Sequence, residues 1–264
     1  MRIAVLGGGV MGETLATGFL RLDPRPSVVI VEKRAERAQE LRDGLDVDIA
    51  PLEQAVDGAD VVVLVVKPQD ISDLLAAAGP LLKPGCLAIS IAAGIRTSTI
   101  ESAVPAGVNV VRAMPNTPAR IGEGTTGISA GATCSTEAVA LAERLMSSVG
   151  LVVTVPEDLQ DAVTAVSGSG PAYLFYLAES MTAAGVDLGL DPATARLMVN
   201  QTLLGAATLL SASDDDAEEL RRKVTSPGGT TAAAIATLDD AGVASDVRAA
   251  LTAARDRSRE LSGS

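Results

Sequence analysis

The first half of the chain alternates short apolar runs with longer stretches whose apolar residues recur at helical spacing. The short runs are rich in valine and isoleucine, which is typical of parallel strands covered on both faces. Six runs predict strands at residues 2–6, 27–31, 60–66, 86–91, 108–113 and 151–155. Helical spacing predicts helices at residues 10–22, 35–44, 71–78 and 135–149. This alternation indicates an α/β fold with a Rossmann-type, doubly wound sheet.

Beyond Pro156 the strand pattern stops and only helical spacing remains. Helices are predicted at residues 159–167, 171–184, 192–211, 217–225, 230–240 and 245–261. The third of these has a clear start, because Asp191 is a good N-cap residue and Pro192 suits the first helical position. We therefore expect an α/β domain over residues 1–155 and an all-α C-terminal domain over residues 156–264.

The predicted helix at residues 192–211 is apolar over more of its circumference than a surface helix needs. Its large apolar residues are Leu197, Met198, Leu203, Leu204, Leu209 and Leu210. Because one small helical domain offers few partners for such a helix, a second subunit is its natural cover. We therefore expect an obligate homodimer that interlocks through the helical domains.

Composition narrows the chemistry that the protein performs. The chain has 264 residues, a formal net charge of -12 and no histidine, so we expect no nucleic-acid partner, no anionic membrane partner and no histidine-based catalysis. Cys86 and Cys134 have no metal-ligand spacing, and we expect no metal. No apolar run is long enough to span a membrane, and two cysteines without a disulfide framework suit a reducing compartment, so we expect a cytoplasmic protein.

A glycine fingerprint follows the first predicted strand. Gly7, Gly9 and Gly12 match G-x-G-x-x-G, with Val10 and Met11 between the last two glycines. The pattern opens a predicted helix, and Glu32 lies 20 residues beyond Gly12 at the end of the second strand. This context predicts a dinucleotide site, in which the glycines allow a tight turn and a close approach of the pyrophosphate. Residues 1–155 are therefore expected to bind a dinucleotide.

The choice between the two nicotinamide dinucleotides stays open. Glu32 is able to accept hydrogen bonds from the ribose hydroxyls and repels a 2′-phosphate, which favours NAD. Lys33 and Arg34 follow directly, and Arg34 is placed to turn back and hold that phosphate, which favours NADP. Both basic residues also suit an exposed surface without any ligand.

Three more segments follow predicted strands and belong to the same sheet edge, where open α/β sheets bind ligands. Lys67 follows one strand, although a lysine there is also a common exposed helix-start residue. Ala92, Ala93 and Gly94 follow the next, and their small size allows a nicotinamide ring to approach. Asn116 follows the strand at residues 108–113 and offers both a donor and an acceptor.

In the helical half, residues 226–231 precede a predicted helix. Ser226, Gly228 and Gly229 lead into Thr230 and Thr231. A glycine-rich entry leaves backbone N–H groups free, and the helix dipole favours an anion there. The loop is thus a candidate carboxylate site with two hydroxyls beside it. Ordinary capping by serine or threonine is the alternative.

Together these segments resemble pyrroline-5-carboxylate reductases. The matching stretches are Gly7–Gly12, residues 65–68, Ala92–Gly94, residues 111–118, "VTAVSGSGPAY" at 163–173 and "VTSPGGTT" at 224–231. They occur in order over nearly the whole chain, and the last two are far more specific than the glycine fingerprint.

The resemblance implies an enzyme that reduces the cyclic imine 1-pyrroline-5-carboxylate to L-proline with NADPH or NADH, the last step of proline biosynthesis. It implies that backbone amides of residues 226–231 hold the substrate carboxylate and that the Thr231 hydroxyl faces the ring nitrogen. It also implies homodimers that assemble further into rings. Glu32 departs from the simplest NADP pattern of the family, but we expect NADPH to be preferred and NADH to be used as well.

Two other functions remain as alternatives. A 3-hydroxyacid dehydrogenase also couples a Rossmann domain to helices, but that family uses a lysine on an early helix of its second domain. The predicted helix at residues 171–184 has no lysine, and Lys223 is the only lysine after Lys83. The third function is a dinucleotide-binding sensor without turnover, against which the intact 226–231 loop argues weakly.

Overall fold

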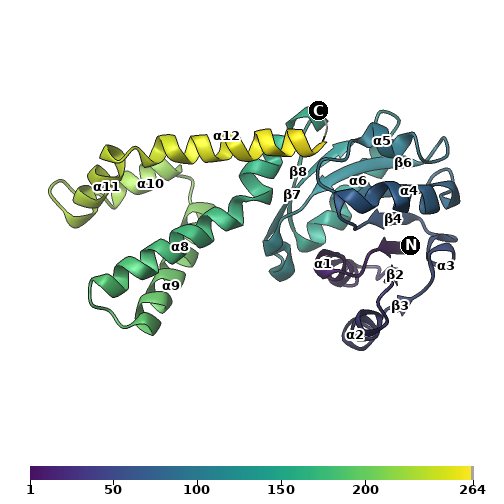
Figure 1. Ribbon diagram of the computed structural model, residues 1–264, viewed down its shortest axis with the longest axis horizontal. Coiled ribbons are helices and arrows are strands. Elements are labelled where there is room, and N and C mark those ends of the chain that lie inside the picture. The colour runs from purple at the N-terminus through teal and green to yellow at the C-terminus, as the bar shows by residue number, and fades with distance from the viewer. Residues whose placement is uncertain (263–264) are drawn as a thin grey trace. The chain divides into compact units, whose positions relative to one another are not determined.

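The computed structural model describes residues 1–262 and divides the chain into two compact units (Figure 1). The first unit holds Met1–Ser169 together with the end of the last helix from Ala254 on, and the second is Gly170–Ala253. The first unit is an α/β sheet domain, and the second consists of helices. The predicted fold class, a Rossmann-type sheet followed by an all-α region, is confirmed.

The first unit is built on one eight-stranded sheet with the order β3-β2-β1-β4-β5-β6-β7-β8. The strands are β1 (Arg2–Leu6), β2 (Ser27–Val31), β3 (Asp48–Ile49), β4 (Val61–Leu64), β5 (Leu87–Ser90), β6 (Asn109–Met114), β7 (Gly124–Ala130) and β8 (Gly150–Thr154). The strands from β3 to β6 run parallel, and β7 pairs antiparallel with β6. Strand order reverses at β1, as doubly wound sheets require.

Helices cover both faces of this sheet. One face packs against α1 (Val10–Phe19), α2 (Ala35–Leu45) and α6 (Thr136–Met146) through buried Leu15, Leu41 and Leu145. The other face packs against α3 (Leu52–Val56), α4 (Ile71–Ala78) and α5 (Thr97–Glu101). The central strands are therefore buried on both sides, which explains their continuous apolar runs.

Strand β7 was not predicted, because its sequence does not look like a buried strand. It contains two glycines, three hydroxyl residues and only one large apolar residue, yet Thr126 and Ser129 are buried in it. The Ser129 hydroxyl donates to the Val155 carbonyl at 2.7 Å and accepts from the buried Gln160 amide at 2.8 Å. Gly127 is required by packing, since a Cβ there would lie 2.6 Å from a methyl of Val163. The partners of this strand are thus supplied by later parts of the chain.

The segment after Pro156 belongs to the first unit, although it is helical. It comprises a short 3-10 turn, α7 (Gln160–Val163) and the π-helical turn η6 (Thr164–Gly168). Glu157 accepts from the Thr97 backbone N–H at 2.7 Å and from its hydroxyl at 2.9 Å, and it lies 3.7 Å from the buried Arg112 guanidinium. These contacts attach the start of this segment to the sheet, and the compact units divide after Ser169.

The second unit contains α8 (Gly170–Asp187), α9 (Pro192–Ala212), α10 (Ala217–Lys223), α11 (Thr230–Asp240) and the first part of α12 (Val243–Ser262). Asp191 caps α9 as predicted, because its carboxylate accepts from the N–H groups of Ala193 and Thr194 at 3.1 Å. Helices α8 and α9 form a hairpin in which Gly185 packs against Ala195.

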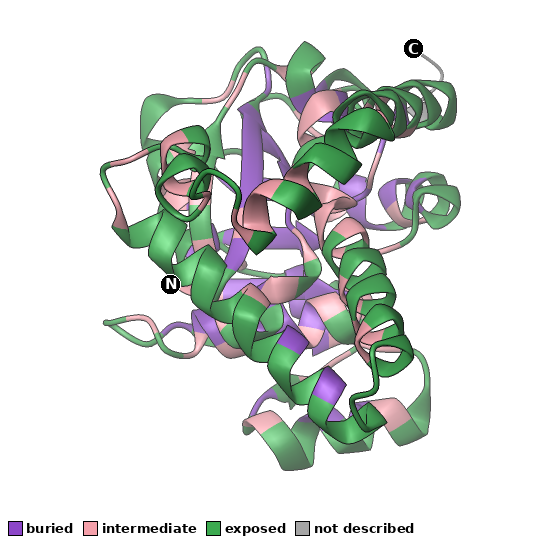
Figure 2. Ribbon diagram, turned by 90° about the vertical axis from the view of Figure 1, so that its left-hand side faces the viewer, coloured by how far each residue is buried: buried purple, intermediate pink, exposed green. Residues whose placement is uncertain are grey.

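Buried residues gather in the sheet, whereas α8–α11 are mainly exposed (Figure 2). Phe175 and Leu197 expose 69% and 71% of their surface. Several other large apolar residues of α8 and α9 are also exposed, among them Leu174, Tyr176, Met198, Leu204 and Leu209. So much exposed apolar surface on two packed helices marks a protein-interaction surface.

Candidate active site

The residues predicted for the dinucleotide site come together at one edge of the sheet. In the register of the parallel strands, Leu6 pairs with Val31 and Leu64, and Leu64 pairs with Ser90. The strands that precede Gly7, Glu32, Lys67, Ala92 and Asn116 therefore end side by side. This is the carboxyl edge of the sheet, at the point where strand order reverses.

The glycine turn between β1 and α1 depends on its glycines for two different reasons. Gly7 has a φ of 128°, and a Cβ there would lie 2.0 Å from the Val65 carbonyl oxygen. A Cβ on Gly12 would lie 1.9 Å from the Gly7 carbonyl oxygen, so the helix packs directly on the turn. At Gly9, by contrast, a Cβ would meet nothing within 4 Å. The turn is thus closely packed against neighbouring backbone at Gly7 and Gly12 and open at Gly9.

Helix α1 begins directly at this opening. Gly9 is its N-cap residue and offers no side chain to its first N–H groups. Val10 is largely exposed, and Met11 is half-buried. Free N–H groups at a helix N-terminus attract phosphate, so the open side of the turn fits a dinucleotide pyrophosphate.

Glu32 and Arg34 form an ion pair at the end of β2. The Arg34 guanidinium donates to both carboxylate oxygens of Glu32, at 3.1 and 3.2 Å, and its backbone N–H donates at 2.9 Å. These hydrogen bonds from Arg34 hold the pKa of the Glu32 carboxyl below its ordinary value. The Glu32 side chain is 8% exposed and that of Arg34 is 69% exposed. Arg34 thereby neutralises the acid that would repel a 2′-phosphate.

Two further segments lie at the same edge with different exposure. Lys67 is exposed at the start of a 3-10 turn, Pro68–Asp70. Ala92 is buried, and Gly94 adopts a φ of 76°, which favours glycine. The side chains of Ala92 and Ala93 leave this part of the edge free of bulk.

Asn116 is engaged inside the protein. Its carbonyl oxygen accepts from the Thr125 backbone N–H at 2.8 Å. Its amide donates to the carbonyl and the hydroxyl of Ser167, both at 3.2 Å. Asn116 thus ties the end of β6 to β7 and to the π-helical turn, a structural task that its place after a strand did not indicate.

In the second unit, residues 226–231 form a turn that leads into α11. Gly228 has a φ of 72°, and the Gly229 N–H donates to the Ser226 carbonyl at 3.0 Å. Gly229 is the N-cap of α11, which begins at Thr230, so no side chain of the cap residue occupies the first N–H groups. Thr231 is half-buried in the first turn. The alternative of a serine or threonine N-cap is therefore wrong for this helix.

Three residues around the glycine turn were not singled out in the sequence. At Gly8 a Cβ would lie 2.6 Å from a methyl of Leu41 and 3.0 Å from Glu32, so this position is also closely packed. Arg37 of α2 donates through Nε to the Gly8 carbonyl at 2.9 Å and pairs with Glu13 of α1. Their roles depend on how α2 packs against the turn, and no local pattern carries that information.

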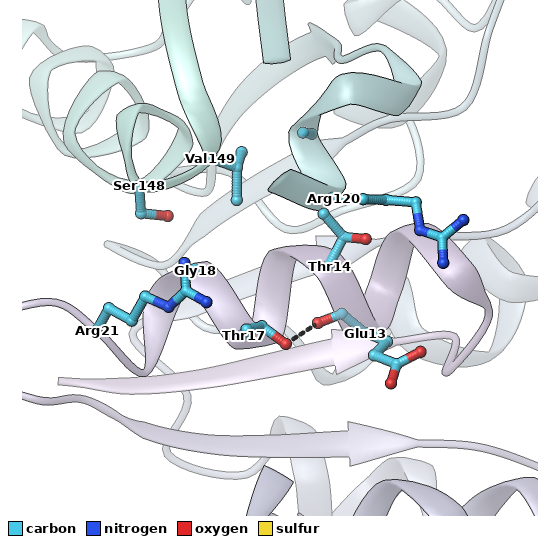
Figure 3. Close-up of a pocket in the computed structure, with 9 residues that line it drawn as sticks. Glu13, Thr14, Thr17, Gly18, Arg21, Arg120, Ser148 and Val149 are labelled. Carbon is cyan, nitrogen blue, oxygen red and sulfur yellow. Dashed lines mark hydrogen bonds between the residues drawn. The ribbon is translucent and has the colours of Figure 1, made fainter. Parts of the chain in front are cut away.

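A polar pocket of about 190 Å³ lies beside α1 (Figure 3). It is lined by Glu13, Thr14, Thr17, Gly18, Arg21, Ala119, Arg120, Ser148 and Val149. The hydroxyls of Thr14, Thr17 and Ser148 all donate to backbone carbonyls. Because those protons are already used, the pocket offers an anion little beyond two exposed arginines.

Within residues 1–262, no group of three or more potential ligand side chains is placed to hold a metal ion. In the same part of the chain, no helix has both the length and the apolar character needed to cross a membrane.

Comparison with known protein families gives a family match for both the N-terminal and the C-terminal part of the chain. Residues 157–261 match the family described as pyrroline-5-carboxylate reductase dimerisation. Residues 2–94 match the family described as NADP oxidoreductase, coenzyme F420-dependent. The N-terminal part is therefore an NAD(P)-binding domain, and the C-terminal part is a dimerisation domain, which makes the protein a homo-oligomer.

Individual relatives agree over the full length. The pyrroline-5-carboxylate reductase of Corynebacterium melassecola is 41% identical, over 98% of each chain. The structure of a pyrroline-5-carboxylate reductase from Coxiella burnetii superimposes with a TM-score of 0.92 at 37% identity, over 99% of this chain and 98% of that one. A pyrroline carboxylate reductase of Plasmodium falciparum with NADP bound gives a TM-score of 0.86 at 26% identity, over 99% of this chain and 98% of that one. The chain belongs to the pyrroline-5-carboxylate reductase family.

Proposed function

We propose that this protein reduces 1-pyrroline-5-carboxylate to L-proline and thereby completes proline biosynthesis. One observation supports the proposal most directly: this chain has two backbone sites suited to anions. The glycine turn is open at Gly9, and helix α11 begins at Thr230 with Gly229 as its N-cap. The first suits a dinucleotide pyrophosphate, and the second suits a substrate carboxylate.

The chain's own residues position the reactants. In the reaction the imine carbon gains a hydride and the ring nitrogen keeps a proton, so the product is a secondary amine. Bound NAD(P)H supplies that hydride. Backbone N–H groups of Ser226, Gly228 and Thr230 hold the carboxylate, with the Gly229 N–H closing the turn on the Ser226 carbonyl, and the Thr231 hydroxyl orients the ring nitrogen. Because a protonated imine is already electrophilic, positioning serves it better than a strong acid, and a chain without histidine is able to perform this chemistry.

For the cofactor, we propose that NADPH is preferred and that NADH is also used. The Glu32–Arg34 ion pair supports this, because the acid is neutralised and a guanidinium stands beside the position of the ribose. The relative from Plasmodium falciparum binds NADP. Gly7, Gly9, Val10, Met11 and Gly12 would hold the pyrophosphate, and Lys67, Ala92, Ala93, Gly94 and Asn116 would border the remainder of the dinucleotide.

The assembly is proposed to be a homodimer whose sites are shared, with dimers that join into rings. Each helical domain would complete the partner's site with its 226–231 loop, and the exposed apolar surface of α8 and α9 would be covered in the dimer. Functionally, residues 1–155 then bind the dinucleotide, and residues 156–264 bind substrate and form the dimer. The family match over residues 157–261 supports that division. The cytoplasmic location stays a prediction.

A spectrophotometric assay distinguishes the candidate functions. NADPH oxidation is followed after addition of pyrroline-5-carboxylate, of a 3-oxoacid semialdehyde, or of buffer. We expect oxidation with the imine only, with proline as the product. Oxidation with the semialdehyde instead indicates a 3-hydroxyacid dehydrogenase, and binding of NADPH without oxidation indicates a sensor.

Complementation tests the shared site. A Gly9 variant and a Thr231 variant, each inactive by itself, are mixed under subunit exchange, which is verified by mass. Recovered activity is the expected result. No recovery after confirmed exchange would mean that each chain holds a complete site.

A further inference from the structure

We propose that Arg37 is a positioning residue for the dinucleotide: it orients the Gly8–Gly9 peptide and offsets the charge of Glu13 in the first turn of α1. This proposal rests on the proposed function, because it concerns the same glycine turn. Arg37 lies outside the G-x-G-x-x-G fingerprint, on the neighbouring helix α2.

The Arg37 guanidinium bridges three groups. Nε donates to the Gly8 carbonyl at 2.9 Å, one terminal nitrogen donates to Glu40 at 2.9 Å, and the other donates to Glu13 at 2.5 Å. The Arg37 side chain is 20% exposed, so it is largely enclosed among these partners. One side chain therefore links the glycine turn, α1 and α2.

The first consequence is the direction of a peptide group. The Asp23–Pro24 bond is the one cis peptide among the described residues, so the peptide between Gly8 and Gly9 is trans. In a planar trans peptide the C=O and N–H bonds point in opposite directions. Because Arg37 holds the Gly8 carbonyl toward α2, the Gly9 N–H points the other way. Gly9 is also the position at which the turn is open.

The second consequence is electrostatic. Glu13 lies in the first turn of α1, where a carboxylate favours the helix itself but repels a bound pyrophosphate. In Figure 3 the Glu13 carboxylate leaves α1 on the opposite side from Ser148 and Val149. Its ion pair with Arg37 offsets this repulsion.

The position of Arg37 in its own helix favours a role outside that helix. It lies in the first turn of α2, which begins at Ala35, and the helix dipole disfavours a cation there. A residue that opposes the local preference of its helix usually serves contacts elsewhere. Hydrogen bonds from Arg37 to Glu40 and Glu13 keep its pKa above the ordinary value, so the charge is permanent.

Equilibrium binding of NADPH, followed by its fluorescence at low and high salt, tests the proposal. Arg37→Ala should raise Kd roughly 10-fold or more, as expected when a charge-assisted hydrogen bond is lost. Glu13→Gln should lower Kd about 2- to 5-fold at low salt and less at high salt. The double variant should bind more tightly than Arg37→Ala alone. The matched control is Arg42→Ala, which removes the same charge from the same helix.

The outcomes separate this inference from the proposed function. If the unmodified protein does not bind NADPH, the proposed function fails. If the unmodified protein binds but Arg37→Ala behaves like Arg42→Ala, the inference about Arg37 is overturned. It is also overturned if Glu13→Gln weakens binding, a test that holds even where Arg37→Ala does not fold. A purely structural brace would not produce tighter, salt-dependent binding in Glu13→Gln.

Discussion

Ser258 donates a 2.6 Å hydrogen bond to a carboxylate oxygen of Asp161, and both side chains are buried although 97 positions separate them. Ser258 lies near the end of α12, and Asp161 lies in α7. The Nε of Arg259 is 4.0 Å from the other carboxylate oxygen. Asp161 thus connects the end of the last helix to the sheet domain.

Ser258→Ala should therefore lower the free energy of unfolding by about 1–3 kcal/mol, because a buried carboxylate loses a donor. Urea denaturation at one fixed protein concentration measures it, since assembly also affects stability. Thr252→Ala, at an exposed site on the same helix, is the control and should change stability by less than about 0.5 kcal/mol. Equal effects of the two variants would contradict a stabilising role of the Asp161 contact.

Two glycine variants should separate folding from dinucleotide binding. Gly12→Ala should destabilise the protein, because its Cβ would lie 1.9 Å from the Gly7 carbonyl oxygen. Gly9→Ala should unfold at the same urea concentration as the unmodified protein, since its Cβ meets nothing within 4 Å, but should bind NADPH more weakly. Circular dichroism and NADPH titration provide the two measurements. Normal NADPH affinity in Gly9→Ala would argue against the pyrophosphate at this turn.

Arg34→Ala should raise KM for NADPH and leave KM for NADH nearly unchanged. The variant removes the guanidinium proposed to hold the 2′-phosphate and leaves Glu32 unpaired. Steady-state kinetics with both cofactors measures the effect, and Lys33→Ala tests the adjacent exposed cation. Equal changes for NADPH and NADH, or no change, would remove Arg34 from the cofactor site.

The Glu32–Arg34 pair should also contribute a pH-dependent part of the stability. The pKa of Glu32 in the folded protein is lower than its ordinary value of 4.5, because Arg34 donates to the carboxylate. The folded state then favours the ionised acid, so the stabilisation is present above pH 4.5 and is lost as the pH falls through the lower folded value. Glu32→Gln should be less stable than the unmodified protein at neutral pH, and the difference should shrink below pH 4.5. Urea denaturation across pH tests this, and a constant difference into acid would refute it.

Thr231→Ala should fold normally and lower kcat/KM for the imine roughly 5- to 150-fold, the range expected for one oriented hydrogen bond. Thr237→Ala, on the same helix with its hydroxyl bonded to Ala233, is the control. An unchanged kcat/KM in Thr231→Ala would limit Thr231 to a role in the helix.

The sequence alone predicts much of the secondary structure of this protein, because local residue patterns specify many of its helices and strands. Strands β1 and β2 and helices α4 and α11 lie where hydrophobic spacing predicted them, to the residue. The glycine fingerprint predicted the crowded turn at Gly7 and Gly12, because such turns need residues without a Cβ. The family, too, was correctly identified from motifs in order along the chain.

Other features depend on contacts between distant residues, and only the tertiary structure decided them. Strand β7 hydrogen-bonds to Gln160 and packs against Val163, both from later in the chain. Because those partners favour polar residues and glycine in the strand, its own sequence lacks the apolar pattern by which a strand is predicted. Arg37 reaches Gly8 only because α2 packs beside the turn, and Ser258 reaches Asp161 only because the chain returns to the sheet. Spacing along a chain reports which face of an element is apolar, but it does not report which distant donor or acceptor that face meets.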